Sequence, residues 1–241
     1  MALYVYSVTA GTHPHRLDGL TGVGESPSPP RTVTAGPLAA VVSDVTEEIR
    51  PKRRDLAAHQ EVQERLMADG TVLPLQFGYT APDDLAVRQA LEDAADDYLA
   101  ALGRLTGCAE YHLRASQEEE PLLRRILKES EEARGLNDRI RSGVADPRLP
   151  VALGELVARE VEQRQDALAA SLVEALLPFA REHAVHPHSA PDFLNLSLLV
   201  SDGSKDDFLT AQADLADRTD RTDDGVELRL TGPLPPYSFV Q

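Results

Sequence analysis

The run Phe193-Leu194-Asn195-Leu196-Ser197-Leu198-Leu199-Val200 alternates apolar and polar residues over most of its length, which predicts a β-strand. Asp202-Gly203 should end this strand. Apolar residues from Phe208 onward recur at helical spacing and predict a helix to about Arg218. A last strand is expected over Val226–Leu230, so this part of the chain reads as strand, helix, strand.

The same periodicities predict further strands and a long helix N-terminal to this run. After Gly107 we expect a strand at Glu110–Leu113, a long helix over about 151–181 and a short strand near Val185. The long helix carries a line of apolar residues, which are Leu153, Val157, Val161, Leu168, Leu172, Leu176 and Phe179. A charged helix over about 117–142 lies between the first strand and the long helix, and we treat it as an insertion. It opens on the capping-box pattern Ser116-Gln117-Glu118-Glu119. Without the insertion the order is β-α-β-β-α-β, the ferredoxin-like pattern.

The N-terminal half begins with a strand at Leu3–Val8, in which Tyr4 and Tyr6 should share one face and Leu3, Val5 and Ser7 the other. A loop rich in Gly, Pro, Ser and Thr follows from residue 9 to 30, and two further strands are expected at 32–34 and 38–42.

A helix is then predicted over about 55–68, capped by Asp55 and ended by Gly70. The apolar run Leu73–Gly78 contains Pro74, so it should be an edge strand or a bulge. A further single helix should begin near Asp83 and extend to about Leu105. The fold class is therefore α+β with an N-terminal α+β domain over 1–106, a ferredoxin-like domain over 107–231 and a Pro-rich tail over 232–241.

Composition restricts the partners. The chain has 40 acidic and 24 basic residues, for a formal net charge of −16. Such a charge repels nucleic acid and anionic lipid surfaces, so neither is an expected partner. Cys108 is alone, which rules out an internal disulfide and fits a reducing compartment. Met1–Val8 lacks the basic start of an export signal, and a cytoplasmic location is the expectation.

The histidines are the residues that most invite a chemical role. His59 stands alone on its helix, where a packed or solvated side chain is commoner than a catalytic one. His13 with His15, and His183 with His186 and His188, lack the Cys or carboxylate partners that zinc sites commonly use. We therefore expect no catalytic residue, no metal site and no cofactor.

Two segments give the chain a family resemblance. They are Leu73-Pro74-Leu75-Gln76-Phe77-Gly78 and the ending Gly232-Pro233-Leu234-Pro235-Pro236-Tyr237-Ser238-Phe239. Together with the opening Tyr4-Val5-Tyr6 and the helix that carries His59, they resemble the gas vesicle protein F/L family along nearly the whole chain. That family often has Arg where Gln76 stands and Trp where Leu234 stands, so a partner contact made by either side chain would be altered here.

The resemblance implies a non-enzymatic accessory protein for gas vesicle assembly. Its implied partners are the hydrophobic shell protein, gas vesicle protein A, and other gas vesicle accessory proteins, with a location in the cytoplasm at the gas vesicle. It also implies two α+β domains, the second ferredoxin-like. A small-molecule-sensing or catalytic two-domain α+β protein is the alternative.

The two signature segments supply the expected site residues, as partner-binding residues or as a clasp that closes the fold. They are Pro74, Gln76, Phe77, Pro233, Leu234, Pro236, Tyr237 and Phe239. The prolines favour an extended polyproline tail. We expect Tyr237 and Phe239 to pack against the first domain near Leu73–Gly78, because exposed aromatic side chains are unfavourable in water.

Overall fold

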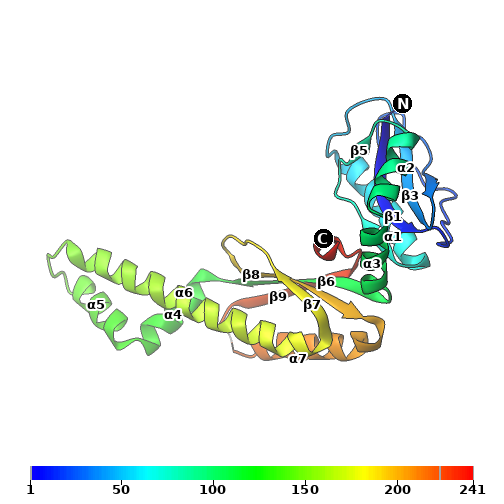
Figure 1. The fold of residues 1–241 in the computed structure, drawn as a ribbon. Helices are drawn as coiled ribbons and strands as arrows, with labels where there is room; N and C mark the ends of the chain where they lie inside the picture. Colours follow the sequence, from blue (N-terminus) through cyan, green and yellow to red (C-terminus); the bar gives the residue numbers. More distant parts are fainter. Residues whose placement is uncertain (1, 223, 241) are drawn as a thin grey trace. The chain divides into compact units, whose positions relative to one another are not determined.

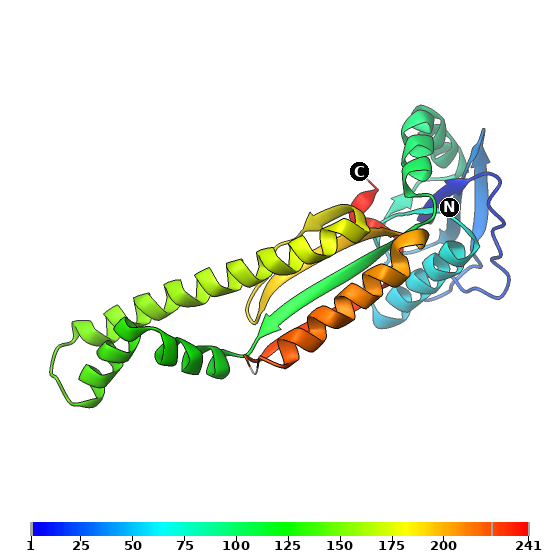
Figure 2. The same cartoon turned by 90° about the horizontal axis from the view of Figure 1, so that it is seen from below.

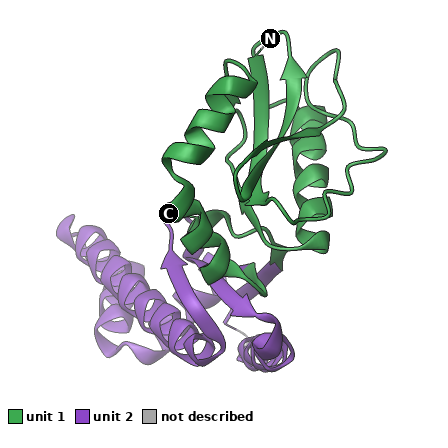
Figure 3. Ribbon diagram, turned by 45° about the vertical axis from the view of Figure 1, so that its right-hand side comes forward, with its two compact units in different colours: residues 1–110, 232–241 green, residues 111–231 purple. Residues whose placement is uncertain are grey.

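The computed structural model describes residues 2–222 and 224–240. The chain forms two compact units (Figure 1, Figure 3). Unit 1 comprises Met1–Glu110 together with Gly232–Gln241, and unit 2 comprises Tyr111–Thr231. The C-terminal tail is thus part of the compact N-terminal unit, although 121 residues (111–231) separate the two segments in the sequence.

Within the described residues, unit 1 holds a five-stranded sheet in the order β2-β3-β1-β4, with β5 also paired to β1. All of these pairs are antiparallel. Helices cover both faces of the sheet (Figure 3). The strands are β1 (Ala2–Ala10), β2 (Arg31–Ala35), β3 (Leu38–Val45), β4 (Val72–Pro74) and β5 (Thr80–Ala81), and the helices are α1 (Arg53–Asp69), α2 (Asp84–Asp93) and α3 (Ala95–Leu105).

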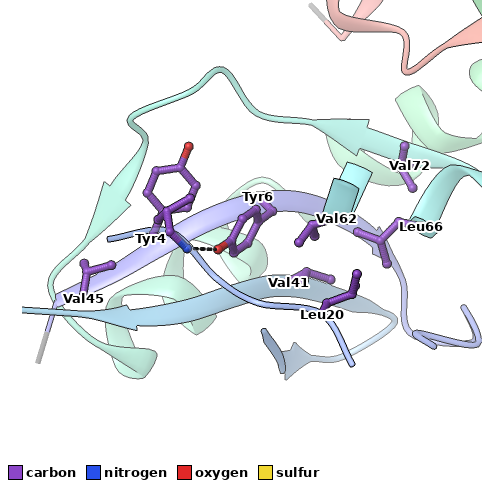
Figure 4. Packing of buried hydrophobic residues seen from close by; sticks show 9 residues of the cluster. Tyr4, Tyr6, Leu20, Val41, Val45, Val62, Leu66 and Val72 are labelled. Atoms are coloured by element: carbon purple, nitrogen blue, oxygen red, sulfur yellow. Dashed lines mark hydrogen bonds between the residues drawn. The ribbon is translucent and has the colours of Figure 1, made fainter. Parts of the chain in front are cut away.

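The core between the sheet and α1 is built on two tyrosines of β1. Tyr4 and Tyr6 are fully buried and pack with aliphatic side chains from β3, β4 and α1 (Figure 4). Leu20 and Val23 come into the same cluster from the long loop after β1. The Tyr6 hydroxyl accepts a hydrogen bond from the Val23 backbone N–H at 3.1 Å, which ties this loop to the core.

The prediction that Ser7 lies on the same face of β1 as Leu3 and Val5 is wrong, because β1 contains a bulge. The register with β3 shifts between Val5 and Ser7, so one extra residue of β1 faces β3. The Ser7 hydroxyl consequently reaches α1, where it donates to Gln63 Oε1 at 3.1 Å.

Two helix predictions in unit 1 also need correction. Asp55 does not cap α1, which begins two residues earlier at Arg53. Its buried carboxylate accepts a hydrogen bond from the Gly24 backbone N–H at 2.9 Å and fixes the loop instead. The expected single helix after Asp83 is two helices interrupted at Ala94, because Ala94 leaves the helical conformation with φ −115° and ψ 24°.

Among the described residues, unit 2 holds a four-stranded sheet in the order β7-β8-β6-β9. β8 lies between β6 and β7, the two strands joined by the long helix α6, which is the split β-α-β arrangement of a ferredoxin-like fold. The predicted α+β class and the placing of residues 193–200 and 226–230 in one sheet are confirmed. The strands are β6 (Cys108–Gln117), β7 (Ala180–Val185), β8 (Asp192–Ser201) and β9 (Val226–Leu234).

Helices α6 (Arg148–Leu176) and α7 (Lys205–Asp220) lie on one face of this sheet (Figure 1). Leu172 and Leu176 of α6 and Phe208 of α7 are fully buried there. The Phe208 ring packs on Tyr111 of β6 with ring centroids 5.0 Å apart. The expected end of α6 at residue 181 is wrong, because Leu177–Phe179 forms a 3₁₀ turn and the chain enters β7 at Ala180.

The expected charged helix over 117–142 is two helices, α4 (Glu119–Glu129) and α5 (Glu131–Arg141). They pack beside the N-terminal part of α6 (Figure 2). β6 continues through Gln117, so the capping box expected at Ser116 does not form. Ser130 instead separates the two helices and caps α5, its hydroxyl accepting from the Ala133 N–H at 3.3 Å.

Candidate functional site: the tail and the His59 cluster

The structure places the aromatic end of the tail on His59 of α1. The His59 Nε2 atom lies 2.9 Å from the Tyr237 hydroxyl, and the two ring centroids are 6.4 Å apart. On the other side of the imidazole, Nδ1 lies 2.9 Å from the Tyr4 hydroxyl. We call His59, Tyr4, Tyr6, Phe77 and Tyr237 the His59 cluster.

Ring contacts hold this cluster together. His59 stacks on Tyr6 with centroids 5.7 Å apart and an interplanar angle of 25°. Phe77 packs edge-on against both Tyr4 and His59, at 5.7 Å in each case. The Tyr4 hydroxyl also accepts a hydrogen bond from the Gly78 N–H at 3.1 Å, and Gly78 has a positive φ of 97° that favours glycine. The Leu73–Gly78 signature and the tail signature therefore meet at one histidine.

Burial sets the protonation of the cluster. It lowers the pKa of His59 to about 4, and a hydrogen bond with the Leu75 backbone opposes the shift. Burial also raises the pKa of Tyr237 to about 12, with the nearby Glu110 carboxylate adding to the effect. At neutral pH all the members are uncharged. A neutral imidazole has one donor and one acceptor nitrogen, so one phenol donates to His59 and the other accepts from it.

A carboxylate anchors the tail next to this cluster. Glu110, near the start of β6, is only 5% exposed. Its two oxygens accept from the Ser238 N–H at 2.9 Å and from the Ser238 hydroxyl at 2.7 Å. Arg104 of α3 donates to the Phe239 carbonyl at 2.6 Å. The last turn of the chain is thus held by charge-assisted hydrogen bonds as well as by apolar packing.

The tail differs from the extended polyproline segment that its prolines predict. β9 continues through Gly232 and Pro233 to Leu234, so the expected end of this strand at residue 230 is wrong. Residues Tyr237–Phe239 form a 3₁₀ turn, with the Phe239 N–H bonded to the Pro236 carbonyl at 3.1 Å. Within this turn the Phe239 side chain is 5% exposed.

The expected site residues divide into two groups. Pro74, Pro236 and Phe239 are buried, and Phe77, Leu234 and Tyr237 are half-buried. Gln76 and Pro233 are exposed. Pro74 ends β4, opposite Ser7 of β1. Sequence reasoning missed Glu110 and Arg104, although an acidic residue within the apolar alternation of a strand is a usable signal of a paired buried carboxylate.

His13, His15 and His186 each take part in other hydrogen bonds. His13 Nε2 bonds to the Leu66 carbonyl at 3.0 Å, and its Nδ1 accepts from the His15 N–H at 3.1 Å. In unit 2, His186 Nε2 lies 2.9 Å from the Ser197 hydroxyl. Across residues 2–222 and 224–240, the structure contains no group of three or more His, Cys, Asp or Glu side chains placed to hold a metal ion. None of the helices in that part of the chain has the length and apolar character needed to cross a membrane.

Known proteins match the chain along its full length. The model of the family described as gas vesicle synthesis protein GvpL/GvpF matches residues 2–241. The chain is 40% identical to gas vesicle protein F of Streptomyces sp. (strain CB03234), with 100% of both chains covered. It is 28% identical to gas vesicle protein L1 of Halobacterium salinarum, covering 98% of this chain and 89% of that protein.

Solved structures share the fold. The crystal structure of the gas vesicle protein GvpF from Anabaena sp. PCC7120 superposes with a TM-score of 0.83 at 19% identity, covering 100% of this chain and 98% of that one. The GvpF structure from Microcystis aeruginosa gives a TM-score of 0.77 at 21% identity, covering 100% and 99%.

Proposed function

The chain belongs to the gas vesicle synthesis protein GvpL/GvpF family, and we propose that it is a non-enzymatic accessory protein of gas vesicle assembly. In this role it binds gas vesicle protein A, other gas vesicle accessory proteins, or both, and it is associated with the gas vesicle in the cytoplasm. The observation that carries the proposal is the full-length family match, which includes both units.

The chemistry of the His59 cluster supports a binding role over a catalytic one. His59 is neutral and both of its ring nitrogens are engaged by phenols of the same chain. A general base must instead present a free nitrogen to its substrate. The cluster is suited to fixing the tail in place.

The division of the signature residues suggests two separate uses. We assign Tyr237, Phe239 and Phe77 to a clasp that stabilises unit 1, because they are wholly or partly buried there. Gln76 and Pro233 are exposed and remain available to a partner.

Co-purification tests the proposal. The tagged full-length chain would be co-expressed with gas vesicle protein A and the accessory proteins of the same gas vesicle gene set, captured, and its bound proteins identified by mass spectrometry. We expect at least one gas vesicle protein to be retained in excess over an unrelated hydrophobic protein expressed at the same level. Retention of none of them, or a turnover activity lost in His59→Ala, would contradict the proposal.

A further inference from the structure

An open groove of about 950 Å³ lies in unit 2, away from the His59 cluster in the sequence. It is lined by α4, by α6, by the end of β6, by the loop between β7 and β8 and by the start of β8. Apolar side chains from three of these elements meet in the groove. They are Leu122 and Leu123 of α4, Val157 and Val161 of α6, and Phe193 at the start of β8. Leu123, Val157 and Val161 are half-buried and so remain accessible.

Carboxylates also line the groove, and all of them except Asp192 are exposed. They are Glu118, Glu119, Glu162, Asp166 and Asp192, and no Lys or Arg is among the described residues that line the groove. Arg114 approaches Asp192 from outside the groove at 3.9 Å and is itself 53% exposed, so it offsets the negative charge only weakly. The groove therefore combines an apolar lining with a negative rim.

We infer that this groove binds an amphipathic helix of another gas vesicle protein, whose apolar face contacts the lining and whose flanking Lys or Arg side chains pair with the rim. The inference rests on the proposed function and adds to it a binding surface and the chemistry of the partner.

The spacing of the lining residues favours a helix as the occupant. α6 contributes three pairs of neighbouring residues to the lining, and each pair follows the previous one by four residues. The pairs are Val157 with Ala158, Val161 with Glu162 and Gln165 with Asp166. These pairs extend over nine residue steps, or about 14 Å along the helix axis. Rows of side chains at this spacing form the ridges and grooves into which a second helix packs. An apolar helix face laid into such a groove is a recurrent mode of peptide recognition.

The charge of the rim favours a basic partner. A neutral segment bound there would leave the rim carboxylates unpaired near an apolar surface, and an acidic segment would add further carboxylates to them. Lys and Arg side chains would instead neutralise the rim. The interaction should therefore weaken as salt screens the rim.

Two groove variants and one matched control test the inference. Glu162→Lys with Asp166→Lys reverses the charge of two exposed rim residues, and Ala158→Trp fills the groove from an exposed position. The control, Glu155→Lys with Glu174→Lys, makes the same change in net charge at exposed positions of α6 outside the groove. Each full-length protein would be assayed for capture of co-expressed gas vesicle proteins. Binding of a labelled 18-residue amphipathic Leu/Lys peptide and of its Leu/Glu counterpart would be measured alongside.

We expect both groove variants to lose at least tenfold in captured partner and in Leu/Lys peptide affinity, while the control keeps wild-type values. The Leu/Glu peptide should bind the wild-type protein at least tenfold more weakly than the Leu/Lys peptide. Wild-type capture by both groove variants would overturn the inference and leave the proposed function standing. Equal losses in the groove variants and the control would also overturn it, because overall charge would then explain the binding. If the wild-type protein captures no gas vesicle protein, the proposed function itself fails.

Discussion

The His59 cluster of unit 1 and the groove of unit 2 are both built from residues far apart in the sequence, but they differ in what covers them. The imidazole of His59 lies under Tyr237 of the tail, with both of its nitrogens bonded. Val157 and Leu123 instead face an open groove with an acidic rim. The conspicuous signature segments thus largely engage one another. The groove, which helix α4 of the insertion forms together with α6, is instead open to solvent.

This difference predicts that the two regions respond differently to substitution. Changes at the tail should lower stability, and changes at the rim of the groove should lower binding. The following experiments would separate these effects or show that they cannot be separated.

Truncation after Gly232 should have the largest effect. It removes the buried Phe239 and half-buried Tyr237, and leaves the Glu110 carboxylate without its Ser238 donors. The free energy of unfolding of unit 1 should fall by about 3–5 kcal/mol, measured by urea denaturation. Tyr237→Phe, which keeps the ring and removes only the hydroxyl, should cost about 1 kcal/mol. A truncated chain as stable as the full-length one would show that the tail does not hold the fold.

Acid should weaken the His59 cluster next. Because burial holds the pKa of His59 at about 4, below its ordinary value of 6.5, the unfolded chain takes up this proton at a higher pH than the folded chain. Stability from this group is fully present above pH 6.5 and is lost as the pH falls towards 4. The loss should be on the order of 2 kcal/mol between pH 7 and pH 5. His59→Gln should flatten the pH dependence of the unfolding free energy in this window, and an unchanged slope would contradict the assignment.

The contact between Glu110 and Ser238 should show a smaller, specific coupling. A double-mutant cycle with Glu110→Ala and Ser238→Ala isolates the hydroxyl hydrogen bond at 2.7 Å. We expect a coupling energy of about 1–2 kcal/mol, since the acceptor is charged and buried. Additive effects of the two substitutions would mean that this bond contributes nothing to tail docking.

The rim of the groove should be nearly silent in stability. Glu162 and Asp166 are exposed on α6, so the double reversal to Lys should change the unfolding free energy by no more than about 0.5 kcal/mol. Thermal and urea denaturation would both detect a larger change. A loss above about 2 kcal/mol would make the rim part of the fold and weaken the contrast with the tail.

Local patterns predicted the fold where the signal was periodic. The alternation at residues 193–200 and the apolar line of α6 were enough for the strand and helix order of unit 2. The patterns did not show the bulge in β1 or the interruption at Ala94, because each depends on packing against other elements. The pairing of Glu110 with Ser238 joins residues 128 positions apart. The groove could not be predicted from local patterns either, since α4 and α6 line it only after the insertion folds back on α6.

Hydrogen–deuterium exchange can follow the two regions within one molecule. It would be measured on the protein alone and on the protein bound to a captured gas vesicle partner. We predict new protection at residues 118–123, 157–166 and 188–193, with unchanged protection around His59 and at 237–239. New protection at the tail and the His59 cluster, with none in the groove segments, would contradict it.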